Sequence, residues 1–95
     1  MQGSSIQNVT ILITCGGSAA AVSLIQILKS QNEIPCKIIV TDVDPLAPGL
    51  FIADVAHKVP PSSSPEYINT LRQICESESV DILIPGLSNE YIQLS

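Results

Sequence analysis

Basic residues are scarce in this 95-residue sequence. Four lysines and arginines stand against nine aspartates and glutamates, which gives a net charge of −5. The four basic residues form no cluster: Lys29, Lys37, Lys58 and Arg72. Nucleic-acid binding depends on clustered positive charge, so the composition argues against a nucleic-acid partner.

The sequence also lacks a long apolar run. No stretch approaches the roughly 20 apolar residues that a membrane-spanning helix needs. The N-terminus has neither the basic start nor the apolar segment of a signal peptide. We therefore expect a cytoplasmic protein with no membrane partner. Residues 1–8 are expected to be a disordered lead-in, natural or introduced by cloning.

Cysteine and histidine are few and widely spaced. The three cysteines are odd in number and lie in apolar or turn contexts, which predicts free thiols in a reducing compartment. No spacing of cysteine and histidine resembles a zinc site, so we predict no metal ligands in this chain.

Aliphatic residues, by contrast, are abundant, and hydrophobic residues make up 45% of the chain. Runs rich in Ile, Val and Leu favour a parallel sheet covered on both faces. Strands are predicted over residues 9–14, 36–41, 57–59 and 81–85. Helices are predicted over residues 18–30 and 64–79, with one short helical turn over residues 50–53.

This alternation of strands and helices predicts an α/β, Rossmann-like fold. We expect a parallel sheet of about four strands in the order 3-2-1-4, with helices on both faces. Ser18 and Ser64 are the predicted N-caps, and Pro65 is expected at the first position of its helix. The domain covers residues 9–95. Because the chain stops just after a further helix start at residues 88–90, we interpret it as a fragment of a longer protein.

The turn after the first strand is the leading candidate site. The run Val9–Thr14 ends at Cys15, Gly16, Gly17 and Ser18. A dinucleotide-binding turn would read G-x-G-x-x-G, and Cys15 takes the place of its first glycine. The turn is therefore a purely structural connection, part of a substrate or phosphate site, or an NAD-binding turn.

Four other residues have both a functional and a structural interpretation. Asp42 and Asp44 follow the second strand, where an acid could bind a ribose, although a turn role is favoured. His57 could act as a catalyst, but it has no sequence-evident partner, so a packed or solvated side chain is the favoured interpretation. Glu90 either reaches the crevice at the strand ends or caps a helix.

Cys15 carries a further alternative. It lies next to a helix N-terminus, where its thiol could be activated. A small buried filler at the end of the strand is the favoured interpretation.

A series of short motifs then resembles a known family. The motifs occupy residues 9–17, 41–50, 53–54, 59–61, 80–86 and 89–90, reading VTILITCGG, TDVDPLAPGL, AD, VPP, VDILIPG and NE. In this order and spacing they resemble the N-terminal domain that precedes the ATP-grasp fold. The resemblance is closest to carbamoyl-phosphate synthase large-subunit-like proteins and related carboxylate-amine ligases. It covers nearly the whole chain from Val9 to about Tyr91.

The resemblance implies a function for the parent protein. The ATP-grasp module of such a ligase binds ATP and magnesium and activates a carboxylate as an acyl phosphate, which an amine attacks. The N-terminal domain implied here holds no cofactor and has no catalytic residue, and alone it should be inactive. Its partners would be the ATP-grasp module and a small carboxylate or amine substrate, and homo-oligomer formation is left open. Five residues could line the substrate pocket: Gly16, Gly17, Ser18, Asp42 and Glu90.

Two other classes of function are kept as alternatives. One is a stand-alone nucleotide- or NAD-binding module, based on the glycine turn together with Asp42 or Asp44. The other is a protein-interaction domain with an apolar face that a partner covers.

Overall fold

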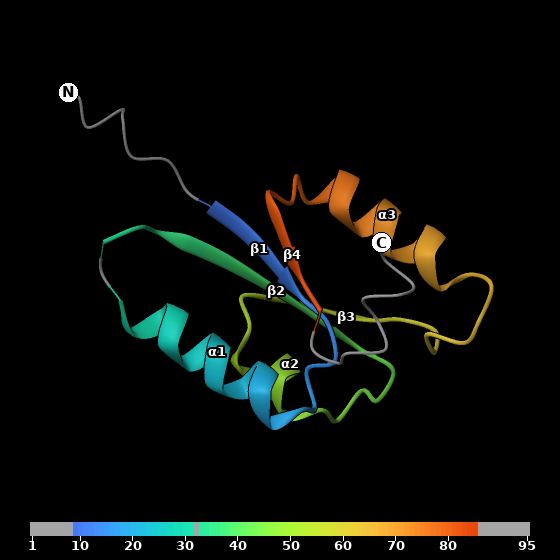
Figure 1. Ribbon diagram of the computed structural model, residues 1–95, viewed down its shortest axis with the longest axis horizontal. Helices are drawn as coiled ribbons and strands as arrows, with labels where there is room; N and C mark the ends of the chain where they lie inside the picture. The colour runs from blue at the N-terminus through green and yellow to red at the C-terminus, as the bar shows by residue number, and fades with distance from the viewer. Residues whose placement is uncertain (1–8, 32, 86–95) are drawn as a thin grey trace.

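The computed structural model describes residues 9–31 and 33–85, which form one four-stranded parallel sheet with helices beside it (Figure 1). The strands are ordered β3-β2-β1-β4. This arrangement confirms the predicted Rossmann-like fold and strand order. The elements are β1 (Val9–Ile13), α1 (Ala19–Ser30), β2 (Cys36–Asp42), α2 (Pro48–Ile52), β3 (Val55–Lys58), α3 (Tyr67–Ser77) and β4 (Ile82–Ile84).

The apolar runs of β1 and β2 place these two strands in the centre of the sheet. Leu12, Ile13 and the run 38–40 of β2 have no exposed surface. A strand buried on both faces needs consecutive apolar residues, which explains these runs. The third strand alternates half-buried and exposed residues, as the predicted edge strand should, but it begins at Val55, earlier than the predicted 57–59.

The two faces of the sheet carry separate cores. Ile11, Ile13, Ile38 and Val40 point toward α1 and α2, and the intervening residues Leu12 and Ile39 point toward α3. Figure 1 shows α1 and α2 on one side of the sheet and α3 on the other. Strand side chains alternate between faces, so one continuous apolar run supplies both cores.

The helix starts agree with the sequence at α1 and differ at α2 and α3. Ser18 is the N-cap of α1, and its Oγ accepts a hydrogen bond of 3.0 Å from the Ala21 N–H. α2 begins at Pro48, two residues before the predicted turn, with the proline at a position that needs no N–H donor. Among the described residues, no helix is long and apolar enough to cross a membrane.

The prediction that Ser64 is the N-cap of α3, followed by Pro65 in the helix, is wrong. The helix begins at Tyr67 with Glu66 as its N-cap. Ser64 instead closes a tight turn before it: its carbonyl accepts from the Tyr67 N–H at 3.1 Å and its Oγ from the Glu66 N–H at 3.2 Å. This i to i+3 bonding delays the first α-helical turn.

Candidate functional site

The turn from β1 into α1 lies at the carboxyl edge of the sheet, and its backbone donors are used within the protein. Gly16 N donates to the Thr41 carbonyl at 3.0 Å and Ser18 N to the Cys15 carbonyl at 3.0 Å. Gly17 N donates to Asp42 Oδ2 at 2.8 Å. A phosphate cradle needs such N–H groups directed at the ligand. In this structure residues 16–18 direct them at the protein itself.

Cys15 has the backbone conformation that glycine would adopt most easily. Its φ angle is 55°, in the left-handed region that is costly for residues with a Cβ. The glycine that a dinucleotide-binding turn would place here could adopt this angle without steric cost. The cysteine is half-buried at the end of β1, which agrees with the interpretation of a small filler.

Gly16 is fixed by a close approach that the sequence did not predict. Its carbonyl accepts a hydrogen bond of 2.8 Å from Gly49 N, at the start of α2. A Cβ on Gly49 would collide with the Gly16 carbonyl oxygen, and a Cβ on Gly16 would collide with the Val40 side chain. The two glycines therefore allow the turn and α2 to touch through their backbones.

Asp42 occupies the position where an anionic ligand would approach the turn. Besides the bond from Gly17, its Oδ1 accepts from Asp44 N at 2.9 Å, and Asp44 Oδ1 accepts from Leu46 N at 3.0 Å. The interpretation of these aspartates as turn residues is confirmed. A carboxylate here complements the positive end of α1 and repels a second anion.

The structure thus brings four of the five predicted substrate residues to one edge. Gly16, Gly17, Ser18 and Asp42 are joined by the turn and its hydrogen bonds. Glu90 lies outside the described residues. Their role in substrate binding stays a prediction.

A cavity of about 190 Å³ opens beside the turn, on the α3 side of the sheet. Thr41, at the end of β2, lines it and is fully buried, and its Oγ1 has no hydrogen-bond partner. An unpaired buried hydroxyl costs about 1–3 kcal/mol. The lining residues are Cys15, Thr41, Asp42, Val43, Val59, Pro61, Ser62 and Tyr67.

No pattern in the sequence predicts this cavity. Thr41 is a polar residue that directly follows the fully apolar run 38–40, which is the one local signal of its position. Val59 and Pro61 come from the connection between β3 and α3, and Tyr67 is the first residue of α3, so only the tertiary structure could place them beside it.

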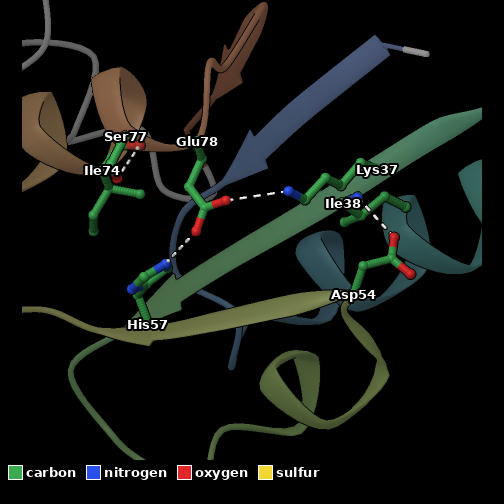
Figure 2. A network of polar contacts seen from close by, with 7 residues as sticks. All are labelled: Lys37, Ile38, Asp54, His57, Ile74, Ser77 and Glu78. Atoms are coloured by element: carbon green, nitrogen blue, oxygen red, sulfur yellow. Dashed lines mark hydrogen bonds and ion pairs between the residues drawn. The ribbon is translucent and has the colours of Figure 1, made fainter.

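The histidine has a partner after all. His57 Nε2 lies 3.1 Å from Glu78 Oε2, and Lys37 Nζ donates to Glu78 Oε1 at 3.2 Å (Figure 2). Both hydrogen bonds lower the pKa of the Glu78 carboxyl below its ordinary value, and the one with His57 has the larger effect. No local sequence pattern predicts this partner, because Glu78 lies 21 residues from His57, at the C-cap of α3.

This cluster links α3 to the sheet. The negative end of the α3 dipole disfavours a carboxylate, and the lysine beside Glu78 offsets this. His57 and Glu78 are not among the residues lining the cavity. The cluster is therefore a structural contact between β2, β3 and α3.

Asp54 forms a second link between elements, on the other side of β2. Its Oδ2 accepts from Ile38 N at 2.8 Å and its Oδ1 from Lys29 Nζ at 3.2 Å (Figure 2 shows the contact with Ile38). The Ile38 hydrogen bond, followed by Lys29, lowers the pKa of Asp54, although burial acts in the opposite direction.

The cysteines and acidic residues that the structure describes form neither a disulfide nor a metal-binding group. None of the three cysteines is in a disulfide, as predicted, and burial raises the pKa of the Cys75 thiol, which keeps it protonated. Within residues 9–31 and 33–85, no three His, Cys, Asp or Glu side chains are grouped to hold a metal ion.

The parallel sheet and the glycine turn at its carboxyl edge define a Rossmann-like α/β domain. Residues 11–95 match the family described as PylC-like, N-terminal domain. The chain belongs to this family, named after the pre-ATP-grasp domain of PylC, a carboxylate-amine ligase. The predicted resemblance to a pre-ATP-grasp domain is confirmed. No curated protein matches the sequence.

Proposed function

We infer that this chain is the N-terminal, substrate-side domain of an ATP-grasp ligase and has no catalytic activity alone. The match of residues 11–95 to the PylC-like N-terminal domain is the observation that carries this proposal. The parent enzyme would use ATP and magnesium to convert a carboxylate into an acyl phosphate. An amine would then attack it, in a reaction similar to those of carbamoyl-phosphate synthase-like ligases.

The hydrogen bonding of the glycine turn supports this division of labour. The N–H groups of Gly16, Gly17 and Ser18 all have partners within the domain, and the Asp42 carboxylate stands beside the helix start. Such a turn offers little to the phosphates of ATP or NAD. The proposal therefore assigns nucleotide and magnesium to the ATP-grasp module and leaves this turn at the edge of the substrate pocket.

Exposed apolar side chains near the turn support docking of that module. Leu46 is 74% exposed and Phe51 70% exposed. Both belong to the segment whose Gly49 contacts Gly16, so they lie on the chain that adjoins the turn. Large exposed apolar side chains favour contact with a partner. In this proposal the partner is the ATP-grasp module of the same protein.

Calorimetric titration of the 95-residue chain with Mg-ATP tests the first part of the proposal. We expect no measurable heat of binding, because the nucleotide site would lie in the other module. Tight binding of Mg-ATP or steady ATP hydrolysis by this chain would refute the proposal. A fluorescence titration with NADH tests the alternative of a nucleotide-binding module, which saturable binding would favour.

Substitutions in the parent protein test the docking face. Leu46→Ser and Phe51→Ser should lower the ligase rate while the domain keeps its stability. Ile27→Ser is the matched control, because Ile27 is 63% exposed but lies on α1. Equal effects of all three substitutions on the ligase rate would contradict the proposed face.

A further inference from the structure

The cavity on the α3 side of the carboxyl edge has the features of a binding site, and it shares Asp42 with the proposed substrate residues. It measures about 190 Å³ and is bounded by the ends of β1 and β2 and by the connection from β3 to α3. A protein cavity of about 150 Å³ can hold a benzene ring. This cavity therefore has room for one group of about that size.

Thr41 supplies an unused polar group in the wall of this cavity. The residue has no exposed surface, and its Oγ1 has no hydrogen-bond partner. Buried hydroxyls almost always have one. Thr41 is among the residues that line the cavity. A ligand that hydrogen-bonds to this hydroxyl would supply the missing partner.

The other residues that line the cavity favour an uncharged ligand. Val43, Val59, Pro61 and Tyr67 provide an apolar lining, in which a charged group would lose its hydration. No lysine or arginine is among the described lining residues, and the Asp42 carboxylate repels an anion. Both carboxylate oxygens of Asp42 already accept backbone N–H groups, so a cation would find a poor partner.

We propose that this cavity binds an uncharged small molecule, or an uncharged side group of a larger one, with a ring-sized apolar body and one hydrogen-bonding group that pairs with the Thr41 hydroxyl. The proposal concerns residues of this chain alone. It does not depend on the ligase assignment, so either can fail without the other.

An NMR titration of the 95-residue chain with three probes tests this proposal. The probes are phenol, toluene and benzoate, which share a ring and differ in polar group and charge. Phenol should shift the backbone amide signals of Thr41, Val43 and Val59, with a dissociation constant of about a millimolar for so small a ligand. Toluene should bind about threefold to tenfold more weakly, since it lacks the hydroxyl. Benzoate should leave these signals unchanged.

Thr41→Val removes the hydroxyl and keeps the branched shape. This variant should lose the preference for phenol over toluene. Thr10→Val is the matched control, a threonine of β1 at the opposite end of the sheet, and should keep the preference for phenol. The proposal would be overturned if phenol left the cavity amides unshifted, if benzoate bound as well as phenol, or if Thr41→Val kept the preference.

Discussion

At the carboxyl edge, the two faces of the sheet are packed differently. On the α1 and α2 side, the turn and α2 meet backbone to backbone at Gly16 and Gly49, and no room is left for a side chain. On the α3 side, the same edge leaves a cavity of about 190 Å³ with an unpaired threonine hydroxyl in its wall. At this edge, the side with the glycine turn is therefore closed by backbone contact, and the side that faces α3 contains the cavity.

The largest expected loss of stability concerns the face on which the turn and α2 touch. Gly49→Ala should lower the free energy of unfolding by about 3 kcal/mol, since its Cβ would meet the Gly16 backbone, which cannot move aside as a side chain can. Urea unfolding measures this change. The control is Gly17→Ala, whose Cβ would lie 3.4 Å from Asp42 Oδ2, and whose φ is not positive. Similar losses in both variants would show that the backbone contact is not the cause.

Removal of the Asp42 carboxylate should have the next largest effect. Asp42→Ala leaves Gly17 N and Asp44 N without their acceptor, and we expect a loss of about 2 kcal/mol from two charge-assisted hydrogen bonds. Asp44→Ala removes one exposed bond to Leu46 N and should cost about 0.5–1 kcal/mol. Thermal unfolding of both variants checks the order, and a reversed order would mean that Asp42 does not hold the turn.

On the α3 side of the sheet, we expect a smaller change in the free energy of unfolding, and of the opposite sign. Thr41→Val removes a buried hydroxyl without a partner and should raise the free energy of unfolding by about 1 kcal/mol in the absence of ligand. Thr10→Val, at the amino end of β1, should change stability less. A destabilised Thr41→Val protein in urea unfolding would indicate that the hydroxyl is satisfied in solution.

The contact between α3 and the sheet predicts the smallest effect, visible in acid. The pKa of Glu78 is lowered in the folded state by His57 and Lys37, so its stabilising contribution is complete above its ordinary value of 4.5 and is lost as the pH falls below it. Between pH 6 and about pH 3, the free energy of unfolding should therefore fall less steeply for Glu78→Gln than for the unsubstituted protein. Glu76→Gln, an exposed change on the same helix, should leave the slope unaltered, and an equal change in both would point to net charge alone.

The sequence alone predicted the class of fold and one edge of the candidate site. The apolar runs identified β1 and β2, and Ser18 identified the start of α1, because these signals act within a few residues. The β3 and α3 boundaries were less accurate. There the edge strand has only a short alternating pattern, and the turn at Ser64 competes with the helix for the same serine.

The polar partners could not be predicted in the same way. His57 lies 21 residues from Glu78, and Gly17 lies 25 residues from Asp42. No local pattern in the sequence connects these pairs. They meet because the helical crossovers between parallel strands bring distant strand ends and helix ends together.

The sequence by itself determined that the chain forms a parallel sheet with a glycine turn at its carboxyl edge, since hydrophobic periodicity and turn residues encode both locally. Only the tertiary structure decided what that turn does. The Asp42 carboxylate takes the N–H of Gly17, and the Gly49 N–H takes the carbonyl of Gly16. The open site moves to the other face, where packing leaves the Thr41 hydroxyl unpaired beside a cavity. Unlike a periodic pattern, a cavity depends on how separate elements fit together.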